Sequence, residues 1–229
     1  MITIRSSQAR GVFRNEWLDS RHSFSFGHYY DPRYMGVSTL RVVNDDRVAP
    51  GAGFDTHPHR DMEIVSYVLE GRIEHRDTLG NRAYLSAGEV QVMSAGTGIM
   101  HSEYNPDEQN SLRFLQLWIL PERKGLHPGY AQKDFSDSKG VTLIVSPDGR
   151  DGSLKIHQDA EIRQLRLSHE SLELSIVPER THYLQIAKGA LSVNGMEMQA
   201  GDGAELKGES LLEIEVPMDV EALLFTLAD

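Results

Sequence analysis

The chain has 229 residues, a formal net charge of −11 and no cysteine. An acidic chain without a cluster of Lys or Arg lacks the positive face that nucleic acid or an anionic membrane requires, so direct binding to either is not expected. The lack of cysteine excludes disulfides, thiolate catalysis and cysteine-held metals, so any metal needs histidine, carboxylate, backbone or water ligands.

Short β-rich runs separated by turn residues dominate the first half of the chain, and no run there has a sustained helical period. Strands are expected within 38–48, 62–71, 71–81, 83–96 and 111–120. The first run is expected to break at a turn formed by Asn44, Asp45 and Asp46, because these residues favour turns. Turns at intervals of about ten residues predict a β-sandwich or β-barrel.

Residues 121–140 are polar and rich in proline and glycine, which predicts a linker. Strands are expected again from residue 141 to the C-terminus. The order of strand and glycine signals in 66–93 recurs weakly in 184–207, which indicates an internal duplication. We therefore predict an all-β chain with two tandem barrels, one in 1–130 and one in 131–229.

Two pairs of alternating polar residues suggest a metal site. His57 and His59 are two residues apart, as are His101 and Glu103, so on a strand each pair points to one side. Such strands facing each other inside a barrel could bring three imidazoles and one carboxylate around one ion. This ligand set suits Fe(II), Mn(II), Ni(II), Co(II), Cu(II) or Zn(II), but not Ca(II) or Mg(II). Spacing alone leaves open a solvated loop or packed histidines.

Both pairs also lie in segments that resemble the two sequence motifs of cupins. The first motif is matched by Gly51, His57, His59 and Glu63, and the second by Gly88, Gly96, His101 and Asn105. There are departures: Gly71 comes one residue late, Ser94 replaces a proline, and two extra residues precede His101. The glycines at 96 and 98 are expected to permit the tight turn that aims His101 inward.

The departures are typical of one cupin family, the pirins. The segments 22–32, 40–71 and 93–105 resemble pirin signatures, and the resemblance extends over most of 15–160. It implies a bicupin, with two antiparallel β-barrels of the jelly-roll, or double-stranded β-helix, type. It also implies one divalent metal in the N-terminal barrel only, held by His57, His59, His101 and Glu103, with Fe(II) the expected ion.

Glu63 is the alternative carboxylate ligand, because other cupins use the glutamate of the first motif. Its position suggests the same strand face as the ligands, and we expect it to support the ligands without binding the ion. The second barrel has only His182 near the expected ligand positions, so it is predicted to be metal-free and structural. His157 and His169 are expected to be exposed or packed polar residues.

The pirin resemblance implies a quercetin 2,3-dioxygenase activity of the EC 1.13.11 class, in which O₂ cleaves a flavonol such as quercetin. Glu103 would accept the proton of the flavonol hydroxyl. The family also implies an alternative, a metal-binding regulator of a transcription factor or metabolic enzyme, with any oxygenase activity incidental. The absence of an apolar signal core or spanning segment predicts a cytoplasmic protein. Two barrels can bury each other, which favours a monomer.

Aromatic and histidine residues elsewhere have weaker assignments. His22 and His28 lie in the aromatic-rich segment 22–32. Its aromatic residues are expected to cover a barrel end or, alternatively, to line a pocket for a planar ligand, namely Phe24, Phe26, Tyr29 and Tyr30. His75 is expected to be a half-buried strand histidine, with a role beside the metal site as the alternative. Trp17 and Trp118 are expected in the core.

Overall fold

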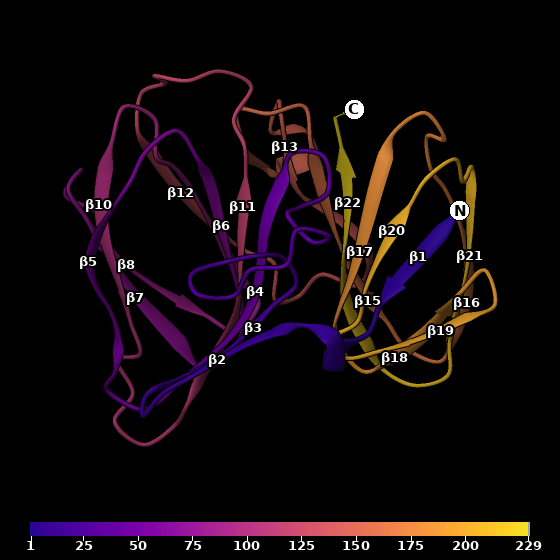
Figure 1. Cartoon of the computed structure of the whole chain (residues 1–229), viewed down its shortest axis with the longest axis horizontal. Helices are drawn as coiled ribbons and strands as arrows, with labels where there is room; N and C mark the ends of the chain where they lie inside the picture. The colour runs from indigo at the N-terminus through magenta and orange to yellow at the C-terminus, as the bar shows by residue number, and fades with distance from the viewer. Residues whose placement is uncertain (229) are drawn as a thin grey trace. The chain divides into compact units, whose positions relative to one another are not determined.

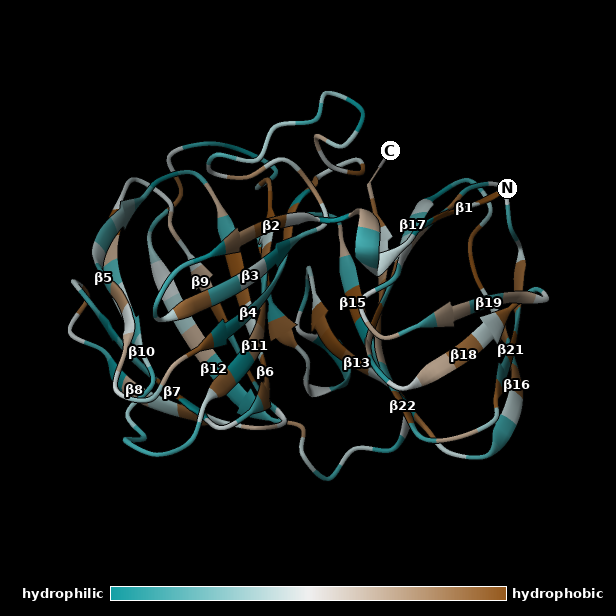
Figure 2. Cartoon of the chain, turned by 60° about the horizontal axis from the view of Figure 1, so that its bottom comes forward, coloured by the Kyte–Doolittle hydropathy of each residue, from teal (hydrophilic) through white to brown (hydrophobic). Residues whose placement is uncertain are grey.

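The computed structural model describes residues 1–228, which form β-strands and two short 3₁₀ turns, with no α-helix (Figure 1). This confirms the predicted all-β class. None of the described segments is a helix capable of crossing a membrane. Figure 2 shows hydrophilic residues along most connecting loops, whereas a strand such as β13 (Gly140–Ser146) is largely hydrophobic.

The chain divides into two compact units. The first contains Gly11–Asp137 and Leu154–Gln158, and the second contains Met1–Arg10, Ser138–Ser153 and Asp159–Asp229. The first ten residues thus belong to the unit that is otherwise built from the C-terminal half. In that unit β1 pairs antiparallel with β20, with Ile2 opposite Leu206.

The first unit consists of two antiparallel sheets. Its larger sheet has the order β12-β9-β6-β11-β4-β3-β2 and its smaller sheet the order β5-β10-β7-β8. The larger sheet is formed by β2 (Gly11–Arg14), β3 (Leu18–His22), β4 (Leu40–Val48), β6 (Glu63–Glu70), β9 (Glu89–Ser94), β11 (Leu112–Ile119) and β12 (Gly129–Asp134). The smaller sheet is formed by β5 (Gly53–His59), β7 (Arg72–Asp77), β8 (Arg82–Ser86) and β10 (Ile99–Tyr104).

The second unit repeats this topology. Its larger sheet contains the order β1-β20-β17-β22-β15-β13, and its smaller sheet the order β16-β21-β18-β19. These strands are β1 (Ile2–Arg5), β15 (Glu161–Leu167), β16 (Glu170–Ser175), β17 (Thr181–Lys188), β18 (Ala190–Val193), β19 (Met196–Gln199), β20 (Gly203–Leu206), β21 (Leu211–Val216) and β22 (Val220–Leu227). The order β9-β6-β11-β4 corresponds to β20-β17-β22-β15, so the repeat noticed in the sequence is a repeat of strand topology, as expected for a bicupin.

The core of the first unit follows the two-residue alternation of its strands. Phe114 on β11 is fully buried and packs in one apolar cluster with Ile73 on β7 and Leu85 on β8. Gln116 and Trp118 follow Phe114 at two-residue steps, so they share its face of the sheet. The same face therefore changes along β11 from an apolar core to polar and aromatic side chains.

Two local predictions are wrong. The predicted linker 121–140 contains β12, a mostly exposed edge strand that pairs with β9, and an exposed strand can be polar without losing its ladder. Asn44, Asp45 and Asp46 form no turn but lie buried inside β4. The Asp45 carboxylate accepts two hydrogen bonds of 2.9 Å from the Arg113 guanidinium, and this pairing makes an acid acceptable inside a sheet.

Candidate metal centre

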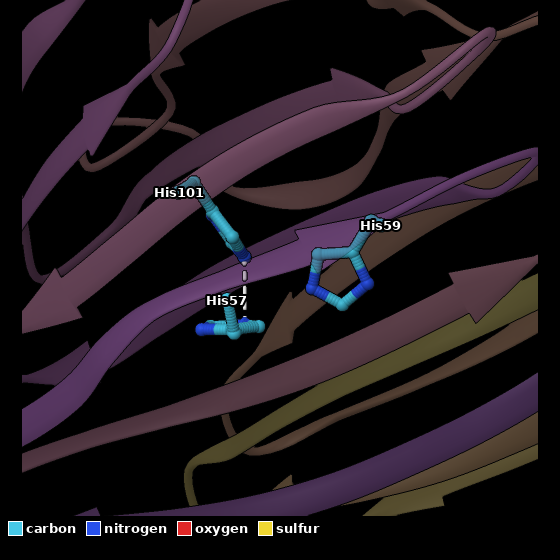
Figure 3. A group of neighbouring side chains, drawn as sticks. All are labelled: His57, His59 and His101. Atoms are coloured by element: carbon cyan, nitrogen blue, oxygen red, sulfur yellow. Dashed lines mark hydrogen bonds between the residues drawn. The ribbon is translucent and has the colours of Figure 1, made fainter.

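The side chains of His57, His59 and His101 converge (Figure 3), and one nitrogen of each ring lies within 4.8 Å of those of the others. The Nε2 atoms of His57 and His101 are 3.1 Å apart. His57 and His59 come from the same side of β5, as their spacing predicted. His101 lies opposite His57, because β5 and β10 are hydrogen-bonded neighbours in one sheet rather than strands that face each other across the barrel.

Two backbone features place His101 and Glu103. A turn precedes β10, where Gly96 and Gly98 have positive φ values of 49° and 139°. A Cβ at Gly96 would lie 2.1 Å from the carbonyl oxygen of Leu126, so only glycine fits, which confirms the expected tight turn. A register shift then follows in the pairing with β5, between His101 and Glu103. Such a bulge changes the direction of the side chains that follow it.

Glu103 is a buried carboxylate held by three neutral donors. Its Oε1 accepts hydrogen bonds from the Ser66 hydroxyl and the Gln91 amide, both of 2.9 Å, and its Oε2 accepts one of 2.7 Å from the Gln116 amide. These donors belong to β6, β9 and β11 of the larger sheet, so both sheets position this carboxylate. Glu103 lies within 4.8 Å of nitrogens of His101 and His75, in a second group of candidate ligands.

His75 is fully buried, not half-buried as the sequence suggested. Its Nε2 is 3.0 Å from the Asp77 carboxylate, and its ring stacks on Tyr130 of β12 at 4.6 Å. Burial raises the pKa of Asp77, but hydrogen bonds from His75 and Asn81 outweigh this and lower it overall. The sequence signal for His75 was its spacing from Asp77, since the two residues form a third pair at i and i+2. Only the pairing of β7 with β10, which puts His75 opposite Glu103, shows that this pair lies beside the candidate ligands.

Two of the three cluster histidines, His59 and His101, have pKa values that keep them in the neutral form that a metal requires. Burial, followed by the neighbouring histidines, lowers the pKa of His59 to about 4 and that of His101 to about 3. Both imidazoles are therefore neutral near pH 7, with lone pairs available for a metal. Imidazole nitrogens bound at 2.0–2.1 Å lie roughly 3 Å apart, so the spacing of His57 and His101 fits a shared transition metal.

The structure corrects the expectation for Glu63. Ser66 on the same strand faces Glu103, and Glu63 is three residues away, so its side chain points to the opposite face of β6. Its carboxylate accepts hydrogen bonds from the Ser94 hydroxyl at 2.7 Å and the His157 backbone N–H at 3.2 Å. Burial raises the pKa of Glu63. It belongs to neither group of candidate ligands, and its contacts do not support the cluster.

A cavity of about 360 Å³ opens beside the cluster, lined by His57, His59 and Glu103. Aromatic side chains form much of its wall, namely Phe13, Phe26, Phe54 and Trp118. The remaining lining includes His22, His28, Leu18, Gly27, Ser20, Asn44, Asp46 and Gln116. Of the aromatic residues in segment 22–32 that were the alternative pocket residues, Phe26 lines the cavity, whereas Phe24, Tyr29 and Tyr30 are not among its lining residues. His22 and His28 line it as well. Trp118, expected in the core, packs edge-on against His59 at 5.0 Å.

In the second unit, His182 is the histidine near the expected ligand positions, and its ring nitrogens are hydrogen-bonded to protein groups. His182 is buried, donates from Nε2 to the Val177 carbonyl at 2.9 Å, and has its Nδ1 3.2 Å from the Thr226 hydroxyl. Both nitrogens are thus used in hydrogen bonds. Within residues 1–228, both groups of three possible metal ligands lie in the first unit.

Two barrel-like units of repeated jelly-roll topology, with a histidine cluster inside one of them, define a bicupin with a candidate metal site. A family model described as Pirin matches residues 4–119, and one described as Quercetinase C-terminal cupin domain matches 143–227. The chain belongs to the pirin family.

Full-length relatives and solved structures agree with this assignment. The chain is 49% identical over 228 residues to the quercetin 2,3-dioxygenase of Escherichia coli K12, covering 99% of each chain. It is 44% identical to a putative quercetin 2,3-dioxygenase of Pasteurella multocida, with 99% of this chain and 100% of the relative covered. The crystal structure of the bacterial pirin YhhW from E. coli in complex with nickel(II) matches with a TM-score of 0.95 at 48% identity, covering 99% of both chains.

Proposed function

We propose that this protein is a metal-dependent dioxygenase that cleaves a flavonol such as quercetin with O₂, a quercetin 2,3-dioxygenase of the EC 1.13.11 class. The observation that carries the proposal is that the histidine cluster borders an aromatic cavity of about 360 Å³. A structural ion is enclosed by its ligands, whereas a catalytic ion keeps a position open to substrate. The relatives described as quercetin 2,3-dioxygenases support the same reaction.

In this proposal His57, His59, His101 and Glu103 hold one divalent ion per chain, and the second unit remains metal-free. The grouping of the histidine nitrogens and the burial of Glu103 beside His101 support this ligand set. We propose Fe(II) as the ion, because histidine and carboxylate ligands with open positions are typical of non-haem iron oxygenases. Ni, Cu, Mn, Co and Zn are the alternative ions to be tested. Nickel must be included, because the related pirin YhhW has been crystallised in complex with nickel(II).

The residues of the chain have separate tasks in this reaction. When bound, the ion supplies a Lewis-acidic and redox-active centre. The rings of Phe54 and Trp118 orient a planar substrate and keep water out of the cavity. Glu103 Oε2 accepts the proton of the flavonol hydroxyl. This oxygen has one hydrogen-bond donor, Gln116, whereas Oε1 has two, so Oε2 retains more capacity to accept.

The test is O₂ consumption together with loss of the flavonol absorbance band when quercetin is added. The full chain is stripped of metal and reloaded in turn with Fe(II), Mn(II), Ni(II), Co(II), Cu(II) or Zn(II). We expect turnover that depends on the ion and is lost in His101→Ala but retained in His127→Ala, a control at an exposed histidine. Glu103→Ala should lose activity while metal remains bound, and full activity in that variant would overturn the role of Glu103.

No turnover with any ion, in wild-type protein that binds one ion per chain, would contradict the enzymatic proposal. The regulatory alternative, in which the metal-bound protein acts on a protein partner, would then be favoured.

A further inference from the structure

We propose that Asp46 and Asn44 on β4 form a polar subsite of the cavity that hydrogen-bonds a ring hydroxyl of the substrate, separate from the metal-binding side chains. The proposal rests on the proposed function for the identity of the ligand. It concerns how the cavity selects a hydroxylated aromatic molecule, a task that the histidine cluster does not explain.

Two buried polar atoms on β4 lack a hydrogen-bond partner among the described residues. Asn44 and Asp46 are two residues apart on β4, line the cavity, and are 2% and 4% exposed. Neither Asn44 Oδ1 nor Asp46 Oδ1 has a hydrogen-bond partner among the described residues. Buried polar atoms are nearly always hydrogen-bonded, because leaving one unpaired costs free energy. Two such atoms on one wall of a cavity indicate a ligand with hydrogen-bonding groups.

The polar side chains next to these two atoms already have partners within the protein. Asp45 projects from the other side of β4 and is paired with Arg113. Gln116 lies opposite Asn44 in the register of β4 and β11, but its amide donates to Glu103. The Ser20 hydroxyl hydrogen-bonds the Asp46 carboxyl group. Asn44 Oδ1 and Asp46 Oδ1 on β4, and Trp118 Nε1 on β11, therefore remain without a partner among the described residues that line the cavity.

The chemistry of the lining defines the class of ligand. Among the described residues, none that lines the cavity is a lysine or arginine, which disfavours a carboxylate or phosphate ligand. Burial raises the pKa of Asp46 to about 7, so near neutral pH the carboxyl group is partly protonated and can both donate and accept. Such a group pairs well with a neutral hydroxyl. With Phe13, Phe26, Phe54 and Trp118 around it, the hydroxyl is expected on a planar aromatic ring.

The test compares two flavonols on the metal-loaded full chain by isothermal titration calorimetry under argon, so that binding is measured without turnover. Quercetin carries ring hydroxyls beyond the one beside its carbonyl, and 3-hydroxyflavone lacks them. In Asp46→Leu and in Asn44→Leu, which remove the acceptor atoms at similar size, we expect the Kd for quercetin to rise about tenfold. The Kd for 3-hydroxyflavone should change by less than about twofold, because that ligand makes no such hydrogen bond.

Asp137→Leu, at an exposed aspartate, is the matched control and should change neither Kd. Equal losses for both flavonols, or no loss for quercetin, would overturn the subsite, as would failure of quercetin to bind the wild type. A crystal structure of the wild-type quercetin complex decides the matter even if both variants fail to fold. It should place a ring hydroxyl within hydrogen-bond distance of Asp46 Oδ1 or of Asn44, and any other pose would contradict the proposal.

The subsite and the enzymatic proposal fail in different ways. If quercetin binds selectively through Asp46 but is not turned over in air, the result supports the subsite and contradicts the dioxygenase proposal. If the protein turns over quercetin and Asp46→Leu keeps the wild-type preference for quercetin, the result supports the dioxygenase proposal and contradicts the subsite.

Discussion

The Nε2 atoms of His101 and His57 lie 3.1 Å apart, because the two residues are direct neighbours across the antiparallel pair of β10 and β5. Their spacing is therefore set by a backbone ladder and not by flexible loops. His59 joins them from the same strand as His57, with its ring 4.9 Å from that of His101. A site built on paired strands is preorganised before any ion arrives.

Removal of metal is expected to lower the thermal stability of the protein without unfolding it. The apolar cluster around Phe114 and Ile73 includes none of the proposed ligands, so the barrel does not need the ion to fold. An ion present at 100 times its Kd stabilises by about 2.7 kcal/mol, which corresponds to a fall in Tm of roughly 5–10 °C on chelation. Circular dichroism with and without EDTA measures this. Loss of the β-sheet signal at 25 °C would instead identify a structural ion.

Glu63→Ala is expected to destabilise the fold and leave metal binding unchanged. The substitution removes the acceptor of the His157 backbone N–H and the nearer acceptor of the Ser94 hydroxyl, whose other contact is His157 Nδ1 at 3.2 Å. The expected cost is about 1–3 kcal/mol. Urea unfolding gives the stability, and mass spectrometry of the bound metal gives the stoichiometry. A variant that loses its metal would show that Glu63 acts in the metal site after all.

His75→Ala is expected to weaken metal binding although His75 is not a proposed ligand. The change removes the ring that lies between Asp77, Tyr130 and His101, so the cluster loses its packing on one side. Partners behind metal ligands are typically worth tenfold or more, and we expect metal affinity to fall by about that factor. Competition with a chelator measures the affinity. Arg76→Ala, at the exposed neighbouring residue, should bind metal like the wild type.

Asp46 is expected to make the metal-free protein less stable as the pH rises. Burial raises its pKa from 3.8 to about 7 in the folded state, so between these values the folded chain binds more protons than the unfolded chain. Stability therefore falls across that range and levels off above pH 7. Between pH 5 and pH 8 the loss due to Asp46 is roughly 2–3 kcal/mol.

Asp46→Asn has no such titration and provides the comparison. Urea unfolding of wild type and variant at both pH values isolates the contribution, since the histidines are common to the two proteins. Parallel pH dependences in wild type and variant would contradict the assigned pKa of Asp46.

The sequence by itself determined the local features of this protein. Alternating apolar residues and regular turns predicted the strands, and the spacing of His57 with His59 and of His101 with Glu103 predicted side chains on a shared face. These properties depend on residues close together in the chain and on the period of two in a strand. The resemblance to pirins added the expected ligand set, and the family and the bicupin fold are confirmed.

Only the tertiary structure decided which strands are neighbours and which buried charges have partners. Asp45 and Asp46 were predicted to form a turn. Nothing nearby in the sequence indicates that Asp45 pairs with Arg113 or that Asp46 lines a cavity. Glu63 hydrogen-bonds Ser94 and His157, and His75 stacks on Tyr130, so these contacts come from other strands or segments. Only Asp77 lies on the same strand as its partner His75. Strand pairing joins residues far apart in the chain, and most buried polar groups need a hydrogen-bond partner, which such pairing often supplies from a distant segment.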